Sequence, residues 1–285
     1  MSIRPPGERL LDQATTTLTD AGVGSPRVDA ELLLSHVTGV PRAMLRLSAR
    51  PNEVQRRDYL ALVAARAARV PLQHLTGSAA FRHVDLEVGP GVFVPRPETE
   101  LLAGWAVQQL SARGPESPVV VDLCTGSGAI ALSIVHEVPT AVVHAVELDE
   151  VAFGWAHQNL AGTGIDLRLG DMADAFGDLD GTVDVVVANP PYIPLDAWES
   201  VAPEVRDHDP ALALWSGDDG LDAMRVVEQT AWRLLRPGGV VGAEHADAQG
   251  DTAPAVFAGR WVDVRDHVDL AGRPRFVTAR RPADR

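Results

Sequence analysis

The spacing of hydrophobic positions divides this chain into three stretches. Residues 8–70 place apolar side chains three and four apart, the period of amphipathic helices. Pro26 suits the first turn of one helix, and Asn52 can cap another that runs towards Val70 and ends before Pro71. We therefore predict a small helical bundle over residues 1–75.

The middle stretch, residues 76–97, changes to the two-residue period of a strand. Apolar and acidic residues alternate over 84–88, a glycine-proline turn follows at 89–91, and the apolar pattern resumes at 92–94. We predict a β-hairpin that links two domains.

The remainder, residues 98–285, alternates helical and strand patterns after a first helix from 98 to 110. Such alternation is typical of an α/β fold with a mainly parallel sheet and helices on both faces. The predicted strands lie near 118–123, 141–147, 165–169, 183–188, 239–244, 261–267 and 274–279.

Composition limits the setting in which this protein works. The chain has a single cysteine, Cys124, so it can form no internal disulfide, which fits a reducing compartment. Its first residues lack the apolar stretch of a signal peptide, and no apolar run reaches the roughly 20 residues that span a bilayer. We expect a soluble, cytoplasmic protein.

The net charge of −14 is unevenly distributed, and all 25 basic residues are arginines. Residues 1–80 hold 10 arginines against 7 acidic residues, whereas the rest is strongly acidic. An acidic catalytic part is poorly suited to a phosphate backbone, so we expect no direct nucleic-acid binding. The basic N-terminal part could contact an acidic partner, but we favour the interpretation that it is a solvated, arginine-rich helix surface.

A glycine loop follows the predicted strand at 118–123 and precedes a helix. Glycines let a backbone approach a ligand and let the helix N-terminus face it, although a tight turn would also need them. The loop lacks the Lys-Ser/Thr ending of a P-loop, which disfavours phosphoryl transfer. Its residues are Cys124, Thr125, Gly126, Ser127 and Gly128.

Two acidic residues follow the next two predicted strands. Glu147 ends one strand, where a carboxylate can accept both hydroxyls of a ribose. Asp171 follows the other and could accept from an adenine amino group, with Met172 packed on the ring; an ordinary loop acid fits Asp171 equally well. With the glycine loop, these residues predict a site for an adenosyl nucleoside.

The tetrapeptide Asn189-Pro190-Pro191-Tyr192 follows the buried strand at 183–188. The Asn189 side-chain oxygen and the Pro190 carbonyl can accept both N–H bonds of a flat NH2 group, and Tyr192 can cover that group and exclude water. Methyl transfer from a sulfonium needs mostly such positioning, which can supply roughly 7–11 kcal/mol. The alternative is a strand exit that is merely stiffened by prolines.

Other polar groups are less informative. The nine histidines form no ligand pattern, so we expect no metal site. We interpret Cys124 as a small apolar loop residue and Glu244 as structural. Arg96 could face the substrate, but we favour a role in bracing the hairpin onto Glu98 or Glu100.

Nearly the whole chain resembles the HemK-type release-factor glutamine methyltransferases. The hairpin signature and the tetrapeptide together carry the resemblance, because the tetrapeptide alone also occurs in methyltransferases acting on nucleobase amino groups. The similar segments are 71–77, 81–100, 122–128, 189–192, 213–222 and 269–273.

The resemblance implies the fold of class I S-adenosylmethionine-dependent methyltransferases: a Rossmann-like, mainly parallel seven-stranded sheet. It implies a substrate-docking helical domain (1–75), a hairpin linker (76–97) and a catalytic domain (98–285). The substrate would be the glutamine of the Gly-Gly-Gln motif in class I peptide chain release factors, methylated on its side-chain nitrogen. S-adenosyl-L-methionine would leave as S-adenosyl-L-homocysteine. We expect a monomer.

By the family pattern, the loop 124–128, Glu147, Met172 and Asn189 contact the cofactor. Residues 189–192 contact the substrate, with Asn189, Pro190 and Tyr192 as catalytic residues. Three departures stand out: Cys124 replaces a glycine of many relatives, His208-Asp209-Pro210 replaces Tyr-Glu-Pro, and Met172 replaces a tryptophan of some.

Two other functions compete. A nucleic-acid amino-group methyltransferase would use the same tetrapeptide, but the helical domain, the hairpin and the acidic catalytic part disfavour it. A non-enzymatic binding module with a dead nucleotide site is disfavoured by the intact tetrapeptide and Glu147.

Overall fold

The computed structural model describes residues 6–112 and 117–283. The chain divides into two compact units. One comprises Met1–Ser78 with the short segment Ala202–His208, and the other comprises Ala79–Val201 with Asp209–Arg285. Among the described residues, no helix has the length and apolar character needed to cross a membrane.

The first unit is a helical bundle around its own apolar core, which includes the fully buried Leu11, Leu33 and Tyr59. The predicted cap is confirmed: Asn52 accepts from the Gln55 backbone N–H at 2.9 Å. Its helices are α1 (Pro6–Asp20), α2 (Pro26–Thr38), η1 (Arg42–Met44), α3 (Leu45–Ser48), α4 (Glu53–Ala67), α5 (Leu72–Thr76) and α9 (Pro203–Arg206).

Two features of this unit escaped the sequence pattern. Helix α4 ends at Ala67 rather than near Val70, because Arg69 takes the left-handed conformation with φ of 71°. The remote segment that carries α9 belongs to the bundle through Glu204, which accepts from Arg66 at 3.0 Å and from Arg69 at 2.6 Å.

The second unit contains a seven-stranded sheet in the order β5-β4-β3-β6-β7-β9-β8. Strands β3 to β7 run parallel, and β9 is antiparallel to both of its neighbours, so the predicted mainly parallel sheet is confirmed. The strands are β3 (Val119–Leu123), β4 (Val142–Glu147), β5 (Asp166–Leu169), β6 (Val183–Ala188), β7 (Leu235–Glu244), β8 (Val262–Val268) and β9 (Pro274–Arg280).

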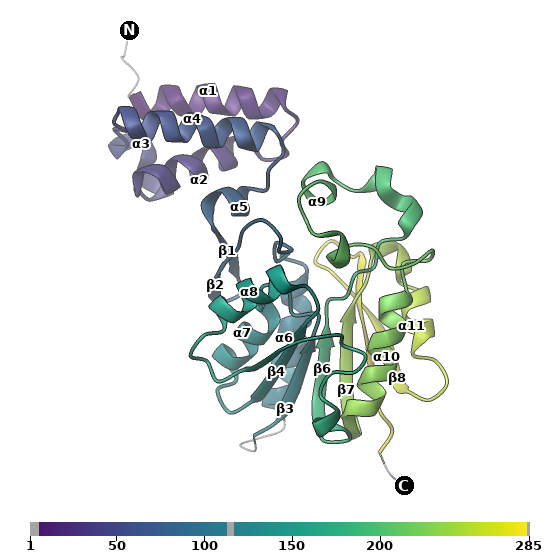
Figure 1. Ribbon diagram of the computed structural model, residues 1–285. Coiled ribbons are helices and arrows are strands. Elements are labelled where there is room, and N and C mark those ends of the chain that lie inside the picture. The colour runs from purple at the N-terminus through teal and green to yellow at the C-terminus, as the bar shows by residue number, and fades with distance from the viewer. Residues whose placement is uncertain (1–5, 113–116, 284–285) are drawn as a thin grey trace. The chain divides into compact units, whose positions relative to one another are not determined.

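Helices cover both faces of this sheet (Figure 1). Valines of one strand alternate between the two cores: Val185 and Val187 pack with α6, α7 and α8, and Val186 packs with α10 and α11. Burial on both faces explains the uninterrupted apolar runs of the central strands. The helices are α6 (Thr99–Ser111), α7 (Ala129–Glu137), α8 (Glu150–Asn159), α10 (Asp222–Leu234) and α11 (Thr252–Val256), with short turns η2 (Gly177–Leu179), η3 (Leu195–Ser200), η4 (Ala211–Ala213) and η5 (Asp247–Gln249).

The hairpin exists, but its predicted second strand at 92–94 is wrong. The two-stranded sheet pairs β1 (Ser78–Phe81) with β2 (Val84–Glu87), and 92–94 forms no strand. Val92 and Val94 are nevertheless buried, so their alternation reflects packing rather than strand pairing. The following prolines at 95 and 97 lack the N–H groups that a ladder requires.

Candidate active site

The carboxyl ends of four neighbouring parallel strands bring the predicted site residues to one edge of the sheet. Strand β3 lies between β4 and β6, and β5 pairs with the far side of β4. The glycine loop, Glu147, Asp171 and Asn189 each follow or end one of these strands. Open α/β sheets bind ligands at this edge.

The glycine loop presents backbone to open space. Gly126 has a φ of 58°, and a Cβ added there would meet nothing within 4 Å. Gly128 has a φ of 87°, and its Cβ would lie 2.9 Å from Leu160, so close packing of the following helix requires it. Cys124 adopts a φ of 60°, which favours glycine.

Side chains beneath the loop hold its shape. The Thr125 hydroxyl donates to the buried Asp122 carboxylate at 2.7 Å, and the Ser127 carbonyl accepts from Asn159 at 2.9 Å. Thr125 and Ser127 are both buried, and within the loop only Cys124 and Gly126 are partly exposed. Burial raises the pKa of Asp122 to about 7, and its second oxygen has no hydrogen-bond partner.

Glu147 is fixed at the rim of this loop. One carboxylate oxygen accepts from the Gly126 N–H at 2.8 Å, and the other accepts from the N–H groups of Leu148 and Asp149 at 2.9 Å. Burial raises the pKa of Glu147 against the opposing effect of these three bonds. The carboxylate is therefore oriented, and one of its roughly four lone-pair sites is left to accept from a ligand hydroxyl.

Asp171 and Met172 lie beyond the third strand. Asp171 is exposed and accepts from the Ala173 N–H at 2.9 Å, which stabilises its own turn. The Met172 sulfur lies 3.4 Å from the Cys124 sulfur. Burial, reinforced by the carboxylates of Glu147, Asp122 and Asp171, raises the pKa of the Cys124 thiol, so it stays protonated at neutral pH.

The tetrapeptide is anchored by a hydrogen-bonded network. The Asn189 side-chain N–H donates to the Thr99 hydroxyl at 3.2 Å, and Thr99 donates to one oxygen of Glu244 at 2.7 Å. The Tyr192 hydroxyl donates to the other Glu244 oxygen at 3.2 Å. Thr99 and Glu244 are buried, and burial raises the pKa of Glu244 to about 7.

Two further residues hold the chain after the tetrapeptide. Gln249 donates to the Tyr192 carbonyl at 3.2 Å. A Cβ on Gly220 would lie 2.4 Å from that carbonyl, so only glycine fits there. Sequence reasoning missed Thr99 and Gln249 and took Glu244 as structural. One sequence feature could have indicated a role for Glu244. It ends the predicted strand at 239–244, which is the next strand in the chain after the one that precedes Asn189.

Arg96 braces a different partner from those predicted. Its guanidinium donates to Asp209 at 3.0 Å and lies 5.0 Å from the centre of the Phe93 ring. The sequence predicted Glu98 or Glu100 as the partner of Arg96, but tertiary folding brings Asp209 to it instead. The Asp209 side chain is fully buried, and burial raises its pKa to about 6.

These groups fit an adenosyl nucleoside. The space in front of Gly126 is open, and the oriented Glu147 carboxylate can still accept from a ribose hydroxyl. Over 6–112 and 117–283, no group of three or more His, Cys, Asp or Glu side chains could hold a metal ion.

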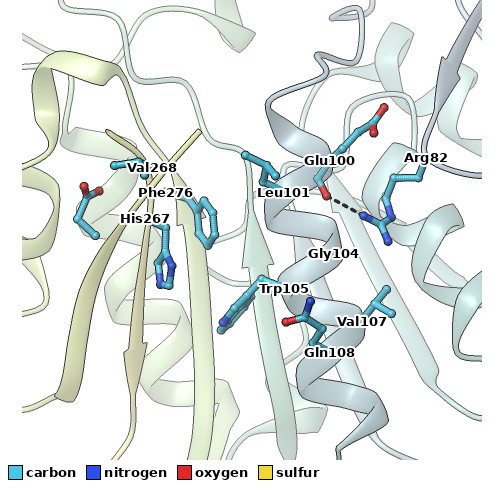
Figure 2. Close-up of a pocket in the computed structure, with 11 residues that line it drawn as sticks. Arg82, Glu100, Leu101, Gly104, Trp105, Val107, Gln108, His267, Val268 and Phe276 are labelled. Atoms are coloured by element: carbon cyan, nitrogen blue, oxygen red, sulfur yellow. Dashed lines mark hydrogen bonds between the residues drawn. The ribbon is translucent and has the colours of Figure 1, made fainter. Parts of the chain in front are cut away.

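A separate pocket of about 690 Å³ lies between α6, β8 and β9. Figure 2 shows Trp105 and Gln108 of α6 opposite His267 and Phe276. The rings of His267 and Phe276 are stacked, with their centres 4.5 Å apart. None of the residues predicted for cofactor or substrate lines this pocket. It is therefore not the candidate active site.

Comparison with known proteins identifies both parts of the chain. Residues 9–77 match the family model of the PrmC N-terminal domain, and residues 83–200 match that of the methyltransferase small domain. A release factor glutamine methyltransferase of Streptomyces coelicolor is 58% identical over 94% of this chain and 96% of that protein.

A second relative and one solved structure are also similar to this chain. A 4-amino-L-phenylalanine/4-methylamino-L-phenylalanine methyltransferase of Streptomyces pristinaespiralis is 44% identical over 88% of this chain and 87% of that protein. The crystal structure of a methyltransferase from Pyrococcus furiosus, 19% identical, covers 77% of this chain and 99% of its own with a TM-score of 0.51, which supports the fold alone. On sequence identity and domain content, the chain belongs to the PrmC (HemK-type) family of release factor glutamine methyltransferases.

Proposed function

We propose that this enzyme methylates the side-chain amide nitrogen of the glutamine in the Gly-Gly-Gln motif of class I peptide chain release factors. The observation that carries the proposal is the anchored tetrapeptide, whose Asn189 side chain is held at the carboxyl end of β6 beside the glycine loop of β3. The 58% identity to a release factor glutamine methyltransferase supports the substrate class.

The cofactor is S-adenosyl-L-methionine, which supplies an electrophilic methyl group on a sulfonium. We propose that Glu147 binds the ribose hydroxyls, that the loop 124–128 binds through its backbone, and that Asp171 and Met172 lie beside the adenine. The oriented carboxylate of Glu147 and the open face of Gly126 support these roles.

The tetrapeptide would position the acceptor nitrogen. An amide nitrogen is a poor nucleophile because its lone pair is delocalised into the carbonyl. The Asn189 side-chain oxygen and the Pro190 carbonyl would accept its two N–H bonds and direct the lone pair at the methyl carbon. Methyl transfer would form the new N–C bond as the S–C bond broke, and the methylated amide would then release its proton. Tyr192 would cover the amide and exclude water.

A methylated small amine is the competing product class, because one relative at 44% identity is named for 4-amino-L-phenylalanine. The match of residues 9–77 to the PrmC N-terminal domain favours a protein substrate. We propose that this helical part docks the release factor, that the enzyme acts as a monomer in the cytoplasm, and that it does not bind nucleic acid directly.

The test is incubation with methyl-labelled donor and, separately, a class I release factor, ribosomal RNA and 4-amino-L-phenylalanine. We expect label in the release factor alone, and none in a factor whose Gly-Gly-Gln glutamine is alanine. Label in RNA or in the free amino acid, with none in the factor, would refute the proposal.

A further inference from the structure

We propose that Thr99 and Glu244 are positioning residues that fix which end of the Asn189 side-chain amide faces the substrate. The inference rests on the proposed function, since it concerns the same acceptor site. Both residues lie behind the tetrapeptide: Thr99 begins α6 and Glu244 ends β7. Thr99 is 4% exposed and Glu244 is 1% exposed, so solvent does not compete for their hydrogen bonds.

The direction of the hydrogen bonds follows from donor and acceptor chemistry. An ionised carboxylate only accepts, so the single hydroxyl proton of Thr99 must point at Glu244. The Thr99 oxygen is then an acceptor towards Asn189, and only the NH2 end of that amide can satisfy it. The amide oxygen of Asn189 is left to face outward, where it can accept from an incoming NH2 group.

The hydrogen bonds that run from Glu244 through Thr99 to Asn189 form a relay. The Tyr192 hydroxyl adds a second branch to this relay. It donates to the remaining Glu244 oxygen, so one buried carboxylate orients both the amide and the aromatic ring of the tetrapeptide. A protonated Glu244 could instead donate to Thr99, whose proton would then point at Asn189. The Asn189 amide would then turn its NH2 end to the substrate. That NH2 group would face the NH2 group of the substrate, and two donors cannot form a hydrogen bond.

The protonation of Glu244 depends on the groups around it. Burial raises its pKa, with a smaller contribution from Glu98 beside α6. Arg275 on β9 and the hydroxyls of Thr99 and Tyr192 act in the opposite direction, and together these effects leave the pKa of Glu244 at about 7. The adjacent His245 is engaged elsewhere, with Asp266 at 2.9 Å. The relay is therefore set to change direction near neutral pH.

The decisive experiment compares Thr99→Val, which removes the hydroxyl at nearly constant shape, with the matched control Thr99→Ser, which keeps it. In the full-length enzyme with a release factor and labelled donor, we expect Thr99→Val to lower kcat at least tenfold. Thr99→Ser should stay within threefold of the wild type, and both variants should bind S-adenosyl-L-homocysteine within threefold. Equal kcat for the two variants would overturn the relay.

The pH profile supplies a readout that a merely structural role would not move. Wild-type kcat should rise about tenfold between pH 6 and pH 8 as Glu244 ionises. Glu244→Gln should have lower kcat and lack this rise, and a variant that keeps it would contradict the inference. If Glu244→Gln fails to fold, the pair at Thr99 decides alone. A wild-type enzyme that leaves the release factor unlabelled refutes the proposed function instead, which separates the two failures.

Discussion

At the scale of single residues, the side chains of the site are held in place by hydrogen bonds from their neighbours. Asn189 offers the acceptor oxygen, and its geometry depends on Thr99 and Glu244 behind it. Glu147 depends in the same way on three backbone N–H groups. Such support is typical of sites whose chemistry consists mainly of orientation.

Replacing Asn189 by alanine should remove the acceptor for one substrate N–H while leaving the glycine loop and Glu147 intact. We expect kcat to fall at least about 100-fold, comparable to the loss of one oriented hydrogen-bonding group in other enzymes. Cofactor affinity should weaken much less. Steady-state turnover and calorimetric binding measure the two effects, and near-normal turnover would contradict the assigned role.

The left-handed conformation of Cys124 predicts local strain. A non-glycine residue in this conformation costs about 1–2 kcal/mol. Cys124→Gly relieves the strain but also removes the sulfur contact with Met172, so Cys124→Ala is the matched control that removes only the sulfur. In urea denaturation, the free energy of unfolding of the glycine variant should exceed that of the alanine variant by about 1 kcal/mol. Equal stabilities would show that the loop carries no strain.

At the scale of elements, hydrogen bonds attach the chain that follows the tetrapeptide to other parts of the same unit. Arg96 holds the buried Asp209, and Gln249 holds the Tyr192 carbonyl. The strands of the sheet could be predicted from the sequence because burial on both faces leaves a clear apolar signature. The hairpin register could not, because Val92 and Val94 show the same alternation without pairing.

The Arg96–Asp209 pair predicts a pH-dependent stability. Burial raises the pKa of Asp209 from 3.8 to about 6, so its contribution to stability is present below pH 3.8 and is lost as the pH rises through about 6. Removing Arg96 leaves a buried carboxylate without its counter-charge. Arg96→Leu should therefore cost about 1–3 kcal/mol at pH 8 and much less at pH 5.

Thermal unfolding at the two pH values checks this expectation. Asp209→Asn is the control, because the neutral amide keeps the shape without the charge. The double variant should lose the difference between pH 5 and pH 8. A destabilisation by Arg96→Leu that is the same at both pH values would mean that the ring contact with Phe93, rather than the ion pair, supplies the stability.

At the scale of the whole molecule, two units have separate cores and separate charge. The helical unit matches the PrmC N-terminal domain, and the sheet unit carries the predicted chemistry. Removing residues 1–75 should raise the KM for the release factor more than it weakens cofactor binding. An unchanged KM would count against a docking role.

The truncation also deprives Glu204 of Arg66 and Arg69, so it needs a control. Glu204→Gln in the full chain removes the same ion pairs while keeping the helices. Its KM for the factor should stay near that of the wild type. A KM raised as much as in the truncated protein would assign the effect to the segment that carries α9 instead.

The sequence alone determined the strand order along the chain, the glycine loop, the acid at the end of β4 and the tetrapeptide, because local periodicity and covalent neighbours encode them. It also carried enough family signal to predict the reaction. Only the tertiary structure decided that Thr99, Glu244 and Asn189 form one hydrogen-bonded line and that Arg96 faces Asp209. These partners are far apart in the chain and meet on neighbouring elements, so no local pattern marks them. Buried polar groups find their partners through the packing of the sheet, and that packing is a property of the whole fold.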